Sequence, residues 1–168
     1  PEGYQAADVE IRVKARPYYG ENRLYGVSYR LSSAKGTYYS EGYHVLLNEA
    51  GVKLTFGRTT VAEKQATIAK RKWHWIRVVA EGVRHRVHVD GALLLDVTDK
   101  SKVDAGHVGL THYYEHVWFD NFAAGKPGAL AGLFEEPPQQ TGPALPRPKP
   151  LPEEPAPLPP PPVTEVTI

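Results

Sequence analysis

Tyrosine is the residue type in this sequence whose spacing most favours binding chemistry. Six of the ten tyrosines occur as adjacent pairs. Neighbouring side chains of a β-strand point to opposite faces, so one tyrosine of each strand pair must face outward. An exposed aromatic ring can stack on the C–H face of a sugar while its hydroxyl group hydrogen-bonds, but tyrosine is equally common in protein interfaces. The paired residues are therefore candidate contacts for a glycan or for another subunit: Tyr18, Tyr19, Tyr38, Tyr39, Tyr113 and Tyr114.

The seven histidines raise the question of a metal site. His112 and His116 are the closest pair that a turn could bring together, but no third ligand accompanies them. His85 faces inward if its segment is a strand, which favours a hydrogen-bonded, semi-buried side chain. The sequence predicts no metal site and no cofactor, although four aspartates offer oxygen donors that calcium could use: Asp96, Asp99, Asp104 and Asp120.

The sequence lacks the residues that several kinds of catalysis and binding require. The absence of cysteine excludes disulfides, thiolate metal sites and cysteine nucleophiles. No Ser/His/Asp arrangement, phosphate-binding glycine loop or acid–base carboxylate pair stands out. The net charge of +1 gives no surplus of one sign for binding nucleic acid or an anionic membrane. The sequence therefore predicts a protein that is not an enzyme and that binds neither nucleic acid nor membranes.

Hydrophobic periodicity predicts an all-β protein. Apolar and charged residues alternate from Asp8 to Ala15, and similar segments recur up to Phe122 with turn-forming residues between them. The Asp90-Gly91 pair lies between two alternating runs and predicts a tight hairpin, because both residues tolerate positive φ. Residues 61–72 also fit a helix by propensity, but the neighbouring segments favour a strand. We expect an antiparallel two-sheet β-sandwich, since nothing long enough for a helical crossover intervenes.

Proline divides the chain into unlike parts. Of the 16 prolines, 13 lie between Pro137 and Pro162, which predicts an extended polyproline II arm. The last six residues are β-branched except for one glutamate and favour a strand. We therefore expect a sandwich over residues 1–124, a connector over 125–136, the arm over 137–162 and a terminal strand over 163–168.

Three segments resemble the concanavalin A-like lectin/glucanase superfamily, and most closely its laminin-G-like modules: residues 73–82, the hairpin 87–99, and 106–110 leading to 119–122. The resemblance covers most of residues 4–124 and implies a jelly-roll sandwich. It says little about function, because this fold carries lectins, glycosidases, adhesins and structural modules. Glycosidases of the laminarinase type have a Glu-x-Asp-x-x-Glu strand, which does not occur here. Only seven residues precede Asp8, so the resemblance implies that a first strand of the family is lacking here.

A lacking strand would leave a sheet edge uncovered, which proteins rarely tolerate. The leading hypothesis is therefore self-assembly by strand addition, with an acceptor edge at Val9, Ile11 and Val13. The donor strand would supply Val163, Thr164, Val166 and Ile168 of another copy. In this hypothesis the protein is a secreted, non-catalytic filament module at the cell surface or outside the cell. Its partners are copies of itself, and surface glycans are further candidate partners. The alternative is a carbohydrate-binding module with tyrosine-rich loops, in which the arm is a linker.

Overall fold

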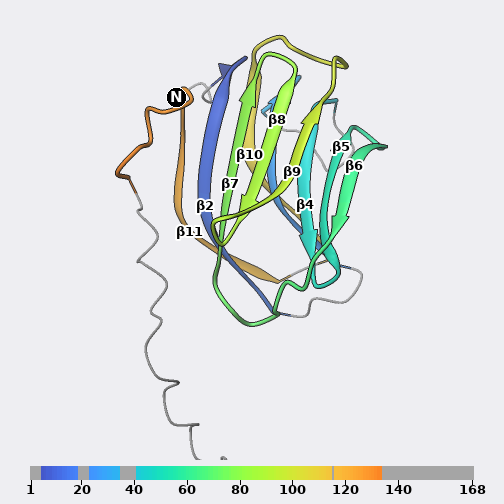
Figure 1. Ribbon diagram of the computed structural model, residues 1–168, viewed down its shortest axis with the longest axis vertical. Coiled ribbons are helices and arrows are strands. Elements are labelled where there is room, and N and C mark those ends of the chain that lie inside the picture. Colours follow the sequence, from blue (N-terminus) through green and yellow to red (C-terminus); the bar gives the residue numbers. More distant parts are fainter. Residues whose placement is uncertain (1–4, 19–22, 35–40, 115, 134–168) are drawn as a thin grey trace, which may run out of the picture. The chain divides into compact units, whose positions relative to one another are not determined.

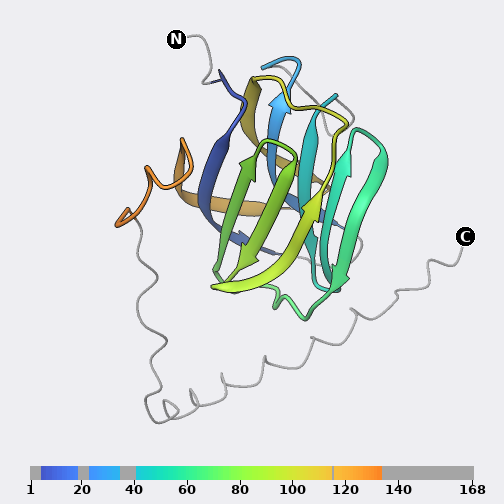
Figure 2. The same ribbon diagram turned by 45° about the horizontal axis from the view of Figure 1, so that its top comes forward.

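The computed structural model describes residues 5–18, 23–34, 41–114 and 116–133. The chain divides into two compact units, Pro1–Pro137 and Pro138–Ile168, and the second lies outside the described residues. The described part of the first unit forms two antiparallel sheets packed face to face (Figures 1 and 2). The predicted all-β fold is thus confirmed, while the proline-rich arm and the terminal strand lie outside the residues that can be described.

Sheet A has the strand order β1-β10-β3-β4-β5-β6, and sheet B has the order β11-β2-β7-β8-β9. Within the described residues the strands are β1 (Gln5–Ala6), β2 (Val9–Pro17), β3 (Leu24–Leu31), β4 (Tyr43–Asn48), β5 (Gly51–Phe56), β6 (Thr59–Gln65), β7 (His74–Glu81), β8 (Arg84–Val89), β9 (Ala92–Thr98), β10 (Gly106–Tyr113) and β11 (Val117–Gly125). In the same part of the chain, no helix is long and apolar enough to cross a membrane.

The alternation seen in the sequence places one face of each strand in the core. Val9, Ile11, Val13 and Ala15 of β2 are all fully buried in the core cluster between the sheets. They lie opposite residues of β7 in register, so the apolar sides of both strands face sheet A. A period-two pattern therefore decides which side chains are inside before any pairing partner is known.

The expected acceptor edge does not exist on β2. This strand pairs with β7 on one side and with β11 on the other, so its backbone groups are already hydrogen-bonded within sheet B. Figure 1 shows β11 running beside β2 at the edge of the sheet. Val9, Ile11 and Val13 are core residues, and the interpretation that they form an open edge is wrong because a strand from the far end of the domain covers it.

Local turn chemistry is as expected at the β8–β9 hairpin. Asp90 and Gly91 have φ values of 50° and 80°, the positive pair that a tight type I′ turn requires. The ambiguous segment 61–72 is divided: its first part belongs to β6, and from Ala66 the chain forms an irregular loop that leads into β7. The Ala66 and Ile68 amides donate to Ala50 O and Glu49 O, and the Ile68 side chain is buried. This contact anchors the loop to the core.

Residues 126–133, which the sequence assigns to a connector, fold against sheet B. The buried Glu10 carboxylate accepts hydrogen bonds from Arg12, Arg77 and the Gly128 amide, all at 2.8 Å. The Arg12 guanidinium also donates to Leu133 O at 3.0 Å. Burial raises the pKa of Glu10, but these hydrogen bonds and the charge of Arg77 outweigh it and lower the pKa below the usual value. One buried carboxylate thus ties the end of β11 to β2 and β7.

Candidate functional site

A groove of about 520 Å³ opens between β11, the edge strand of sheet B, and the part of β10 that extends beyond its short pairing with β1 at the edge of sheet A. By register, His112 shares the inward face of sheet A with Tyr25, but it is exposed because the sandwich is open at this end. Trp118 lies in register with Arg16 on the outer face of sheet B, and its side chain is 51% exposed. We call this hollow the aromatic groove; the described residues lining it are Leu110, His112, His116, Val117, Trp118 and Phe119.

Three of the paired tyrosines adjoin residues that line the aromatic groove. The Tyr18 amide donates to His116 O at 2.9 Å, which holds the end of β2 beside the start of β11. The Tyr18 ring meets the Trp118 ring edge to face, with centroids 5.9 Å apart. Tyr113, the last residue of β10, and Tyr114, in the turn that follows, also pack edge to face at 4.4 Å. Arg23 donates to Tyr114 O at 2.8 Å and fixes this turn, in which Tyr114 has a positive φ of 52°.

Cations lie over the aromatic rings next to the groove. The Arg16 guanidinium is 5.5 Å from the centroid of Trp118, and that of Arg71 is 4.8 Å from the centroid of Tyr18. The Lys14 ammonium is 5.4 Å from Trp73 and a similar distance from Trp75. Cation–π attraction of this kind fixes both partners, so the exposed rings are presented in defined positions.

His74 holds the loop that presents Arg71 and Trp73. The His74 Nδ1–H donates to Asp90 Oδ2 at 2.6 Å, and the Nε2–H donates to Ala69 O at 2.7 Å. The Arg71 amide donates to Pro17 O at 2.7 Å, which joins the same loop to the end of β2. The position of these two side chains therefore depends on a buried histidine with two acceptor partners.

A second hollow of about 270 Å³ lies over β4, β5 and β6 of sheet A. Its polar groups are largely occupied by the protein itself: Asn48 Oδ1 accepts from the Ala50 and Gly51 amides, and Lys53 forms an ion pair with Glu63 at 3.1 Å. No aromatic side chain is among the described residues that line it. The aromatic groove is larger and offers exposed rings, so it is the stronger candidate for a ligand site.

Two hydrogen-bonded pairs resemble a catalytic arrangement, but their tyrosine and histidine side chains are buried between the sheets. The Tyr29 hydroxyl is 2.7 Å from His85 Nδ1, and Tyr43 donates to Asp99 at 2.5 Å. Burial and then the charge of Arg30 lower the pKa of His85 to about 4, so the ring is neutral. Burial and the bond to Asp99 raise the pKa of Tyr43 to about 12. Because Tyr29, Tyr43 and His85 are fully buried, a substrate cannot reach them, and we assign these pairs to the packing of the core.

The structure brings together some of the residues singled out in the sequence and separates others. His112 and His116 both line the aromatic groove, and Tyr18 contacts its Trp118. Tyr113 and Tyr114 contact each other next to His112. His85 faces the core, as its position in the strand predicted. Tyr19, Tyr38 and Tyr39 lie outside the described residues, as do the donor-strand residues Val163, Thr164, Val166 and Ile168.

Trp118 and its cationic neighbours were missed by sequence reasoning. The outward position of Trp118 in an alternating strand was the available indication, but its pairing with Arg16 depends on contacts across the sheet. The calcium candidates are also dispersed: Asp96 is held by Arg84, and Asp99 by Tyr43 and the Ser101 amide. Among the described residues, no three acidic or histidine side chains gather closely enough to hold a metal ion.

Residues 2–124 match the family model of the 3-keto-alpha-glucoside-1,2-lyase-like domain. No curated protein matches the sequence. The carbohydrate-binding module CBM66 from Bacillus subtilis shares the fold with a TM-score of 0.62 and 20% identity, over 74% of this chain and 83% of that chain. A candidate glycosyl hydrolase from Parabacteroides distasonis has a TM-score of 0.54 and 11% identity, over 72% of each chain. An alginate lyase from Corynebacterium has a TM-score of 0.52 and 12% identity, over 72% of this chain and 60% of that chain.

These similarities support the concanavalin A-like jelly roll and correct the leading functional hypothesis. The matched family and the solved neighbours have names from carbohydrate chemistry, and they favour a carbohydrate-binding or glycosyl hydrolase-like domain. The interpretation of the chain as a self-assembling filament subunit is therefore wrong. That interpretation rested on an uncovered edge at β2, which β11 in fact occupies.

Proposed function

Because the chain belongs to the 3-keto-alpha-glucoside-1,2-lyase-like domain family, we propose that it is a carbohydrate-binding module that holds a glycan in the aromatic groove. The observation that carries the proposal is a groove of about 520 Å³ with the half-exposed Trp118 ring beside Tyr18. Ligand sites commonly have volumes of roughly 300 to 1,000 Å³ and combine apolar walls with a few polar groups. A sugar presents just this combination of C–H faces and hydroxyl groups.

The polar groups of the groove suit hydroxyl recognition. His112 and His116 are exposed imidazoles, each of which can both donate and accept a hydrogen bond in its neutral form. Leu110 and Phe119 supply apolar walls on either side. The ring of Trp118 is held by its contacts with Tyr18 and Arg16, so little side-chain entropy is lost when a ligand stacks on it.

Binding without catalysis is the form of this function that the site favours. Glycoside hydrolysis generally uses two carboxyl groups flanking the scissile bond. The described residues lining the aromatic groove include two imidazoles and no carboxylate. In this proposal the proline-rich arm is a linker, the module is of the laminin-G-like subtype, and it works outside the cell or at its surface, where polysaccharides are found.

A glycan array of neutral and acidic oligosaccharides, probed with the full chain, tests the proposal. The Trp118→Ala variant should bind its best glycan at least about tenfold more weakly, because loss of a stacking ring removes more than about 1.4 kcal/mol. Phe122→Ala is the matched control, since Phe122 is an exposed aromatic residue of the same strand that does not line the groove. Absence of binding to every glycan, or equal loss in both variants, would overturn the proposal. Release of reducing ends from a bound glycan would instead show an enzyme.

A further inference from the structure

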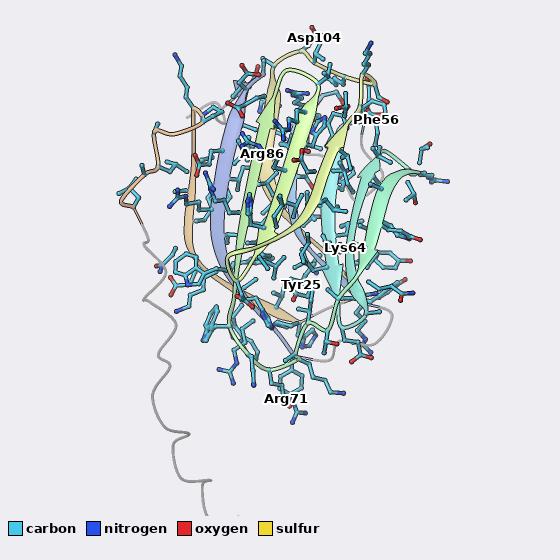
Figure 3. The ribbon with its side chains drawn as sticks, viewed as in Figure 1. Tyr25, Phe56, Lys64, Arg71, Arg86 and Asp104 are labelled. Atoms are coloured by element: carbon cyan, nitrogen blue, oxygen red, sulfur yellow. The ribbon has the colours of Figure 1, made fainter. Side chains whose placement is uncertain are left out.

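The outer surface of sheet B next to the aromatic groove is both cationic and aromatic. The ends of β2, β7 and β11 meet there: Lys14 lies in register with Trp75, and Arg16 with Trp118. The loop before β7 adds Arg71, which Figure 3 shows at the end of the sandwich away from Asp104. We call this area the cationic–aromatic surface; its residues are Lys14, Arg16, Tyr18, Arg71, Trp73, Trp75 and Trp118.

The arginines elsewhere on sheet B have acidic partners. Arg12 and Arg77 both bind Glu10, at 2.8 Å. Arg84 binds Asp96 at 2.6 Å, and Arg86 binds Glu81. Most charges on this face are therefore neutralised within the protein itself.

The cations of the cationic–aromatic surface differ in this respect. Across the described residues, Lys14, Arg16 and Arg71 form no ion pair with a carboxylate. Arg16 and Arg71 are joined instead through a hydrogen bond from Arg16 Nε to Arg71 O at 3.2 Å. Like charges held close together repel one another, so this cluster costs stability unless an anion joins it. A cluster of cations without carboxylate partners is suited to binding an anionic ligand.

Two carboxylates border the surface and leave its positive charge in excess. Asp120 lies opposite Lys14 in the β2–β11 register, and its Oδ1 accepts a hydrogen bond from the Asn121 amide. Asp90 is occupied by two donors, the His74 ring and the Trp75 amide. Both aspartates therefore have other hydrogen-bond partners.

We infer that the glycan is an anionic one, a sugar chain that carries carboxylate or sulfate groups. This inference rests on the proposed function, because it names the ligand class of the same site. Trp118 belongs both to the aromatic groove and to the cationic–aromatic surface, so a chain stacked on this ring lies next to the Arg16 guanidinium. An arginine fork binds carboxylate and sulfate oxygens in pairs, and the rings beneath the cations hold the forks in place.

Calorimetric titration of the full chain with four polymers tests the inference: polygalacturonate, its methyl ester, dextran sulfate and dextran. The charged member of at least one pair should bind about tenfold or more tightly than its neutral counterpart. Its affinity should fall when salt rises from about 50 mM to about 300 mM, because ions screen exposed charges. Polygalacturonate and dextran sulfate distinguish a carboxylate ligand from a sulfate ligand.

The double variant Arg16→Gln/Arg71→Gln should lose about tenfold in affinity for the charged polymer and keep its affinity for the neutral one. Arg84→Gln is the matched control, since Arg84 is exposed on the same sheet but lies at the far end of β8 and is paired with Asp96. Equal binding of charged and neutral polymers, or binding of neutral glycans alone on the array, would overturn the inference and leave carbohydrate binding intact. If no glycan binds, both the proposed carbohydrate binding and the anionic ligand class are overturned. Tighter binding of a DNA duplex than of either charged polymer would also overturn the inference, because it would indicate a general polyanion surface.

Discussion

His74 is a buried residue whose two hydrogen bonds require a positive charge. Its Nδ1 lies 2.6 Å from Asp90 Oδ2 and its Nε2 lies 2.7 Å from Ala69 O. Both partners are acceptors, so both ring nitrogens must carry hydrogen, and only the imidazolium form has two N–H groups. Burial opposes this charge, but the bonds to Asp90 and Ala69 outweigh it and raise the pKa of His74 above the usual value. Folding therefore favours protonation of this ring.

The sign of the pH dependence follows from the raised pKa. The folded-state pKa of His74 exceeds the unfolded value of about 6.5, so its stabilisation is complete below about pH 6.5 and is lost as pH rises through the folded-state pKa. The buried bond to Ala69 contributes about 1 to 2 kcal/mol, and the bond to the half-exposed Asp90 about 1 kcal/mol or less. His74→Gln should thus lower the free energy of unfolding by about 2 to 3 kcal/mol at pH 6, and by less at pH 9.

Urea unfolding followed by tryptophan fluorescence at pH 6 to 9 measures this effect. The informative quantity is the difference in unfolding free energy between the wild type and His74→Gln, because contributions of other titrating groups cancel in it. Asp90→Asn should remove much of the pH dependence, and His112→Gln, at an exposed position, should leave it unchanged. A difference that stays constant from pH 6 to pH 9 would refute the reasoning that His74 is charged.

Three further predictions concern the core and are checked by urea unfolding. Glu10→Gln should lower the free energy of unfolding by about 2 to 4 kcal/mol, since it breaks a buried ion pair. Glu63→Gln breaks an exposed ion pair and should lower it by less than about 1 kcal/mol. Similar decreases in the two variants would contradict the role of Glu10. His85 has a folded-state pKa of about 4, so its protonation opposes folding in acid. The difference in unfolding free energy between wild type and His85→Gln should therefore decrease by roughly 3 kcal/mol as pH falls from about 6.5 to 4. A constant difference would argue against a neutral ring. Gly106→Ala should cost more than about 3 kcal/mol, because its Cβ would stand 2.4 Å from a backbone carbon of β3, whereas Gly109→Ala in the same strand meets nothing within 4 Å and should be tolerated.

The sequence alone determined the features that depend on neighbouring residues. The alternation in residues 9–15 identified a half-buried strand and its inward face, and Asp90-Gly91 identified a hairpin with its turn type. The strand position of His85 predicted that it faces inward. These features follow from the two-residue period of a strand and the φ preferences of single residues, which act over a few positions.

Tertiary structure alone decided the features that depend on distant pairing. No local pattern shows that β11 covers β2, since about 100 residues separate the two strands, and the mistaken edge at Val9, Ile11 and Val13 followed from this. The same pairing sets Trp118 beside Arg16, and the loop hydrogen bonds set Arg71 beside Tyr18. The alternation of apolar and polar residues shows which side chains point outward, but only the strand order shows which of these become neighbours. Register and the position of a strand in its sheet are fixed by the packing of the whole sandwich.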